Sequence, residues 1–180
     1  MPYATTHILI AIILVELFRD FIIKDNKKFP RYYILFAVIG GIIPDLDIGL
    51  FYILNFFGFS FAEIHRTFLH TIFVPLILLS IGGIFYYFHL NNSNVSKHHL
   101  KISWIFFILG FGAILHLLLD MTFAGKIIPF YPFLNLELGL NLIQYAPENL
   151  RELIIPTIDG ILLMLWIFWM EFKLKINNYF

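Results

Sequence analysis

The chain has 180 residues, of which 60% are apolar and only 13% are charged, and its mean hydropathy is +0.84. Soluble domains are roughly half apolar and about a quarter charged, so this composition excludes an ordinary water-soluble globule. Twelve basic residues balance twelve acidic ones, which leaves no excess charge for nucleic acid to recognise. Because cysteine is absent, any metal site must use imidazole and carboxylate ligands.

Five apolar segments approach the roughly 20 residues that a helix needs to cross hydrocarbon. They are His7 to Ile23, Tyr32 to Phe59, Phe68 to Leu90, Ile102 to Phe123 and Leu153 to Leu174. Since Met1 to Thr6 offers no basic region typical of a signal peptide, we expect the first segment to be retained. The sequence therefore predicts an all-α, polytopic membrane helix bundle of about five spans, which forms a single integral membrane domain over residues 1–180.

The second apolar segment differs from the others because Pro44, Asp45 and Asp47 interrupt it. Two carboxylates beside a proline cannot lie in lipid without a partner or a water-filled cavity. The segment is therefore either a broken crossing or a crossing followed by a re-entrant or interfacial helix. We favour the second interpretation, because a full second crossing would put the histidines that follow it on the opposite side from His7.

The positions of lysine and arginine predict the topology of the chain. With five crossings and the interrupted segment counted once, nine of the twelve basic residues fall on one side: Arg19, Lys24, Lys27, Lys28, Arg31, Lys97, Lys101, Lys173 and Lys175. The positive-inside rule assigns that side to the cytoplasm. We expect an integral protein of the cytoplasmic (inner) membrane, with its N-terminus outside and its C-terminus inside.

Histidine and aspartate gather at one depth of the predicted bundle. Helical rise, counted from the anchors on the cytoplasmic side, puts five of these residues about 21 to 26 Å above those anchors, in the outer leaflet. They are His7, Asp45, His70, His116 and Asp159. His65 lies just above this level. Ionisable groups inside a membrane cost several kcal/mol unless they are paired, so each is a candidate for function, on the extracytoplasmic side.

The spacing of these residues along the chain also bears on whether they can bind metal. His116 and Asp120 are four residues apart and share one face of a helix, close enough to hold one ion. His65 and His70 are five apart, so both point inward only if a helix begins between them. Lone intramembrane histidines often serve only helix packing, but the His116 and Asp120 pair favours metal binding.

The candidate donors suit divalent metal ions, zinc first and manganese or iron as alternatives. Four histidines and four aspartates exceed the needs of one tetrahedral ion, whereas two or more ions that share a bridging carboxylate would use them. The candidate metal ligands are His7, Asp45, Asp47, His65, His70, His116, Asp120 and Asp159.

Several of these residues also have structural interpretations. Asp45 and Asp47 could cap the following helix, and Asp159 could pair with Arg151 or with another polar group on the outer side. Arg66 could be an ordinary interfacial anchor, or it could bind a substrate phosphate through its planar guanidinium.

The combination of motifs resembles the YdjM-type family of membrane-bound, metal-dependent hydrolases. The resemblance rests on Thr6-His7, Pro44-Asp45-Leu46-Asp47, His65 to Thr71, His116 to Asp120, Gly125, Pro129 and Asp159. The family motif His-Arg-Gly-x-Thr-His-Ser carries Thr67, Leu69 and Thr71 here at its Gly, Thr and Ser positions, so the hydroxyls around the ligands differ. The order of the ligands is also similar, more distantly, to zinc-dependent phospholipase C and P1 nuclease, which implies phosphodiester chemistry.

We therefore expect a membrane-embedded hydrolase of phosphoesters such as phospholipid head groups, with Asp45, Asp47 and Arg66 in catalytic roles. Membrane lipid is the expected partner and substrate, and no nucleic acid partner is expected. Two alternatives stay open, a divalent metal transporter and a non-catalytic scaffold stapled by metal. The gathering of polar groups at one level disfavours transport, which needs polar groups from one face to the other.

Overall fold

The computed structural model of the chain describes residues 4–25, 29–91 and 96–174. Apart from one isolated antiparallel bridge between Ile127 and Leu138, the regular structure in these residues is helical, which confirms the all-α prediction. Three of the basic residues behind the predicted topology, Lys27, Lys28 and Lys175, lie outside the described residues.

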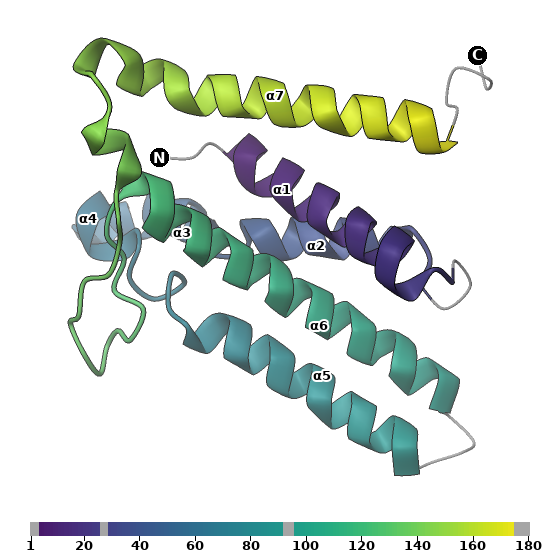
Figure 1. Cartoon of the computed structure of the whole chain (residues 1–180). Helices are drawn as coiled ribbons and strands as arrows, with labels where there is room; N and C mark the ends of the chain where they lie inside the picture. The colour runs from purple at the N-terminus through teal and green to yellow at the C-terminus, as the bar shows by residue number, and fades with distance from the viewer. Residues whose placement is uncertain (1–3, 26–28, 92–95, 175–180) are drawn as a thin grey trace.

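The described residues form seven α-helices and four short 3-10 or π-helical turns (Figure 1). In chain order the elements are α1 (Ala4–Leu17), η1 (Phe18–Ile23), α2 (Tyr32–Ile42), α3 (Leu46–Leu54), η2 (Asn55–Phe57), α4 (Phe61–Ile64), α5 (Phe73–Asn91), α6 (Ser96–Leu119), η3 (Asp120–Ala124), η4 (Leu142–Tyr145) and α7 (Glu148–Leu174). The elements η1 and η3 are π-helical continuations of α1 and α6. Helices α5 and α6 pack as a hairpin, and α6 also packs on α2.

Three helices are long and apolar enough to cross a membrane, namely α5, α6 and α7. A fourth span is added if the bent pair of α2 and α3 is counted as one. The described residues thus give three or four candidate spans by length and composition, rather than the five expected. The difference lies in the first predicted span, where α1 ends after 14 residues and the helix continues as a π-helical turn.

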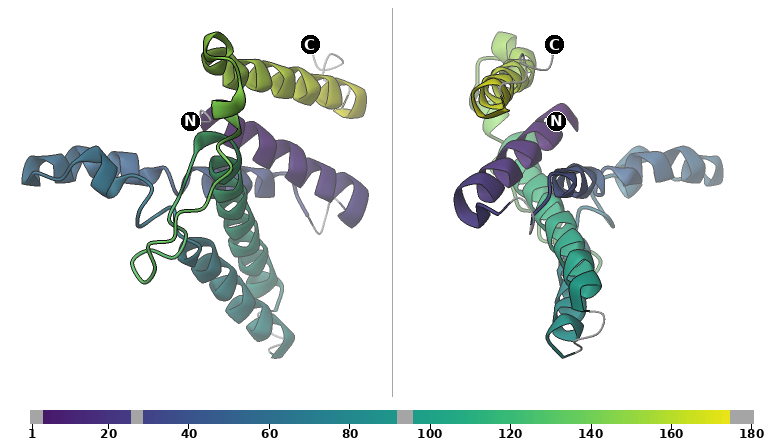
Figure 2. Two further views of the ribbon diagram at one scale, coloured as in Figure 1. Left: turned by 60° about the vertical axis from the view of Figure 1, so that its left-hand side comes forward. Right: turned by 90° about the vertical axis from the view of Figure 1, so that its right-hand side faces the viewer.

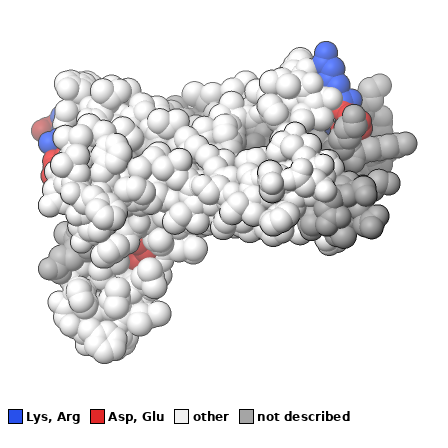
Figure 3. Space-filling model, turned by 90° about the horizontal axis from the view of Figure 1, so that it is seen from below, with Lys and Arg blue, Asp and Glu red and all other residues white. Residues whose placement is uncertain are grey.

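Much of the exposed surface is apolar, as a protein embedded in a membrane requires. Seen from below, charged side chains gather at the two ends of the molecule, and the face between them is uncharged apart from one small acidic patch (Figure 3). Large apolar side chains are exposed on α7, including Phe168 and Phe172. In water this surface would cause aggregation, whereas in a bilayer it contacts acyl chains.

The interrupted segment breaks where the sequence predicts. Helix α2 ends at Ile42, α3 begins at Leu46, and the two axes differ by 44°, because proline at position 44 cannot continue a regular helix. In both views of Figure 2, α3 (blue) extends away from the other helices. The chain nevertheless returns, because Asp47 at the start of α3 lies 2.9 Å from His65 after α4. The two ends of the segment from residue 47 to residue 65 therefore meet, an arrangement that fits the re-entrant interpretation, while the bent pair of α2 and α3 also fits a broken span.

Two glycines let α2 and α6 touch through their backbones. A Cβ atom at Gly40 would overlap the carbonyl group of Leu109, and one at Gly112 would overlap the carbonyl oxygen of Ala37. Small residues at helix contacts are the usual means by which membrane helices approach closely. This approach brings the carbonyl group of Gly41 within reach of α6, which matters for the site described next.

Candidate metal centre

Four parts of the chain meet at one end of the bundle: the start of α1, the break between α2 and α3, the loop between α4 and α5, and the end of α6. They bring together seven of the eight donors predicted from the sequence: His7, Asp45, Asp47, His65, His70, His116 and Asp120. All of these except Asp45 are buried. Buried ionisable groups in such numbers require mutual pairing or a cation.

The centre of this cluster is a group of four donor atoms. His70 Nε2 and His116 Nε2 are 3.2 Å apart, and Asp45 Oδ1 lies 3.6 Å and 3.5 Å from them. Asp120 Oδ2 lies 3.4 Å from His70 Nε2 and 3.7 Å from His116 Nε2. Zinc bonds of about 2.0–2.2 Å in a tetrahedron separate the ligands by about 3.3–3.6 Å. The two imidazole nitrogens, together with the oxygen of either Asp45 or Asp120, are therefore spaced as ligands of one small divalent ion would be.

The far nitrogen of each central imidazole lies close to an oxygen atom of another group. His116 Nδ1 donates a hydrogen bond of 2.7 Å to the Gly41 carbonyl oxygen, and His70 Nδ1 lies 2.9 Å from Asp47 Oδ2. Metal-binding histidines characteristically donate their second ring N–H to a carbonyl or carboxylate, which leaves the other nitrogen unprotonated for the ion. Both imidazoles therefore direct Nε2 toward the same point.

Asp47 contacts His70 on the Nδ1 side of its ring, and it also contacts His65 and the backbone of Arg66. Its Oδ1 lies 2.9 Å from His65 Nδ1, and its Oδ2 accepts a 3.0 Å hydrogen bond from the backbone N–H of Arg66. Arg66 has φ of 65°, a left-handed conformation that is costly for a residue other than glycine and that is often retained at functional sites. Asp47, His65 and His70 could themselves hold an ion, but these contacts favour an orienting role for Asp47.

Replacing Asp47 by asparagine tests this role. The amide keeps the size of the side chain but removes the charge that orients His70 and His65, so we expect metal affinity to fall about 10–100-fold. Titration of purified protein with zinc, followed by calorimetry, measures the change. Complete loss of binding would instead make Asp47 a direct ligand, and Asp20→Asn in η1, which follows α1, serves as the matched control.

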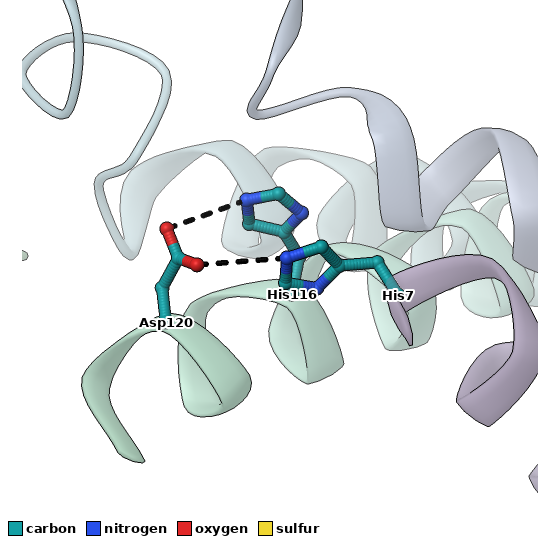
Figure 4. A group of neighbouring side chains, drawn as sticks. All are labelled: His7, His116 and Asp120. Atoms are coloured by element: carbon teal, nitrogen blue, oxygen red, sulfur yellow. Dashed lines mark ion pairs between the residues drawn. The ribbon is translucent and has the colours of Figure 1, made fainter. Parts of the chain in front are cut away.

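Asp120 divides its two oxygens between neighbouring imidazoles (Figure 4). Oδ1 lies 3.5 Å from His7 Nε2, while Oδ2 faces His116 at 3.7 Å, and the rings of His7 and His116 are stacked with centroids 3.9 Å apart. The helix widens from α to π at Asp120, a change of pitch common at functional sites. A carboxylate with this arrangement is suited to bridge two ions.

Two further observations test whether a cation fits. His7 Nδ1 and His65 Nε2 are buried and have no hydrogen-bond partner among the described residues. Burial lowers the pKa of His70, but the carboxylates of Asp120, Asp45 and Asp47 outweigh it and raise that pKa to about 10. The surroundings thus favour a positive charge here, and an ion bound among the same donors would supply it.

Asp159 is the predicted ligand that the described structure does not bring into the cluster. It lies on α7, and its Oδ1 accepts a 2.6 Å hydrogen bond from the hydroxyl group of Thr6. Its contact therefore matches the structural alternative, a pairing with an outer polar group. Arg151 takes no part, since its guanidinium donates to the carbonyl oxygens of Ala146 and Gln144.

Two of the three residues that depart from the family motif, Thr67 and Thr71, have local structural roles. The hydroxyl of Thr67 donates to the Ile64 carbonyl oxygen at 2.6 Å, and that of Thr71 donates to the Phe68 carbonyl oxygen at 3.1 Å. These bonds hold the turn that carries His65 and His70. The substitutions at these positions thus act on the loop backbone.

A cavity of about 370 Å³ lies beside the cluster, and we call it the polar cavity because five of its seven lining residues are polar or charged, the other two being Phe61 and Ile128. His65, Arg66 and Thr67 line one side of it, and Lys126 and Glu137, which pair at 3.0 Å, line the other. The Nε atom of Arg66 lies 3.8 Å from Asp120 Oδ2, so this guanidinium joins the cavity to the candidate ligands. The sequence did not single out Lys126, whose only signal was its position on the side with few basic residues.

The helices and the buried cluster define a polytopic membrane protein with a candidate metal centre of histidine and aspartate. The chain matches the family described as YdjM inner membrane protein over residues 1–176, and it belongs to that family. Comparisons with curated proteins and with solved structures gave no match. The inner membrane is thus the location of the family, in agreement with the composition and the apolar helices.

Proposed function

We propose that this protein is a metal-dependent hydrolase of phosphoesters, with a di- or trinuclear centre in which zinc is the preferred ion. The observation that carries the proposal is the arrangement of Asp120, whose two oxygens face His7 on one side and His70 and His116 on the other. Paired ions that share a carboxylate are a recurrent device for phosphoester hydrolysis, in which they activate water and stabilise charge on the phosphoryl oxygens.

Asp45 is the residue best suited to act as general base. Its Oδ1 faces the central imidazoles, and 22% of its side chain is exposed, so water can reach it. The oxygens of Asp47 are already engaged by His65, His70 and the Arg66 backbone. Of the two carboxylates considered from the sequence, we therefore assign the proton transfer to Asp45 and the orientation of imidazoles to Asp47.

Arg66 is the proposed phosphate-binding group. Its side chain is 20% exposed and lines the polar cavity next to the cluster. A planar guanidinium can donate two parallel hydrogen bonds to one phosphate. A phosphoester held in this way would direct its phosphorus toward the candidate ligands, since Arg66 also lies 3.8 Å from Asp120.

A membrane lipid is the proposed substrate. The cluster lies at one end of helices that carry exposed apolar surface, so a lipid could reach it laterally from the bilayer. The experiment is an assay of purified protein in nanodiscs against phospholipids of defined head groups, with added zinc or manganese. Release of phosphate or of a phosphorylated head group supports the proposal, and absence of turnover across the panel with metal bound would favour the scaffold alternative.

We also propose that the centre faces the extracytoplasmic side. The chain has no cysteine, so a thiol reagent labels only a cysteine that is introduced at a chosen position. Labelling then shows on which side of the membrane that position lies. We expect a membrane-impermeant maleimide to label Phe133→Cys, an exposed position in the loop near the cluster, in intact spheroplasts. His98→Cys, at the opposite end of α6, is expected to react only after lysis. The reverse pattern would invert the orientation.

A further inference from the structure

A second and larger cavity lies next to the candidate centre. It has a volume of about 650 Å³, within the range of ligand pockets, and its walls come from α3, the turn after α4 and Tyr131. The lining is apolar apart from Asp47 and Thr67, and includes Leu50, Leu54, Phe59, Phe68 and Leu69. The apolar cavity therefore reaches a buried carboxylate of the cluster, that of Asp47.

The apolar and polar cavities share one turn of the chain. Thr67 lines both of them, with His65 and Arg66 on the polar side and Phe68 and Leu69 on the apolar side. A ligand that occupied both would therefore have a polar, phosphate-bearing part beside Arg66 and an apolar part beside α3. The order of these surfaces matches the order of groups in a phospholipid.

The apolar cavity also adjoins surface that a bilayer covers. Phe59, Phe68 and Leu50 line it and are themselves 48%, 60% and 45% exposed. Helix α3 and the turn after it carry further exposed apolar side chains, with Phe56 90% exposed. In a bilayer, acyl chains that contact this exposed apolar surface would lie beside the cavity, and its mainly apolar lining would favour their entry.

From this arrangement we propose that the apolar cavity is an acyl-chain subsite. It holds one fatty acyl chain of a membrane phospholipid, while the phosphate of the same molecule lies against Arg66. This inference rests on the proposed function for its phosphate end but assigns a new binding site for the chain. It makes α3 and the re-entrant turn the elements that select a diacyl lipid over a water-soluble phosphodiester.

Photocrosslinking tests the subsite without requiring turnover. The full-length protein in nanodiscs is irradiated with a phospholipid that carries a diazirine on one acyl chain, and the labelled peptides are identified by mass spectrometry. We expect label on residues 50–69, displaced by unlabelled phospholipid but not by the corresponding glycerophosphodiester. Leu54→Trp, which fills the cavity, is expected to lower that label at least fivefold.

Ile53→Trp is the matched control, because it adds the same side chain one residue away at a position that is 60% exposed and does not line the cavity. Equal labelling of both variants, or label spread over all apolar helices, would overturn the subsite. Thermal unfolding of each variant shows whether it is folded, and Leu50→Trp provides a second way to fill the cavity. Specific label without any phosphoester cleavage would retain the subsite and reject the proposed hydrolysis.

Discussion

Replacing Asp120 by asparagine is expected to remove both bound metal and hydrolysis. The carboxylate contributes one oxygen toward His7 and the other toward His70 and His116, so an amide in its place weakens two candidate ion sites at once. Because catalysis by paired ions depends on both, we expect at least a thousandfold loss of turnover. Elemental analysis of the purified variant, beside the wild type, measures the loss of metal directly.

The control for this experiment is Asp159→Asn. That residue was predicted as a ligand with the others, but it accepts a hydrogen bond from Thr6 and lies outside the candidate groups. We expect Asp159→Asn to keep its metal and to lose at most about 1 kcal/mol of stability, because the amide oxygen can still accept the hydrogen bond from Thr6. If Asp159→Asn lost metal as fully as Asp120→Asn, the assignment of ligands by these contacts would be wrong.

The helices and the convergence of most of the donors could be predicted from the sequence because both depend on regular geometry. A rise of 1.5 Å per residue put His7, Asp45, His70 and His116 at one level, and the structure brings all four into one cluster. The break at Pro44 followed from backbone chemistry. Helix boundaries were less predictable, since α5 begins at Phe73 rather than Phe68.

The roles of individual donors could not be predicted, because they depend on which atom each side chain contacts. Asp45 and Asp47 are two residues apart in one turn and looked equivalent, yet only Asp47 is held by His65, His70 and a backbone amide. The Gly41 carbonyl group that fixes His116 is a main-chain group with no signature in the sequence. Asp159 was predicted at the depth of the other donors, but its side chain contacts Thr6 and lies outside the candidate metal groups.

Replacing the side chain of Arg66 is expected to have the second large effect, a loss of hydrolysis. Arg66→Gln removes the guanidinium from the polar cavity, and loss of one preorganised group that stabilises charge in the transition state costs about 10²–10³-fold in kcat. The backbone N–H of this residue, which holds Asp47, is retained in the variant. We therefore expect the metal content to be unchanged while the rate of hydrolysis falls. This combination would separate phosphate binding from ion binding.

Two further variants sharpen this interpretation. Arg66→Lys keeps the charge but not the planar pair of donors, so it should recover only part of the rate if the phosphate is bound in bidentate fashion. Lys126→Gln removes the other cation of the same cavity, which is exposed and paired with Glu137, and solvent screening should limit its effect to a few-fold. Since both cations face one cavity, equal losses for Arg66→Gln and Lys126→Gln would mean that the cavity attracts the substrate through its overall charge. A loss confined to Arg66, with metal retained, would identify the residue that holds the phosphate against the centre.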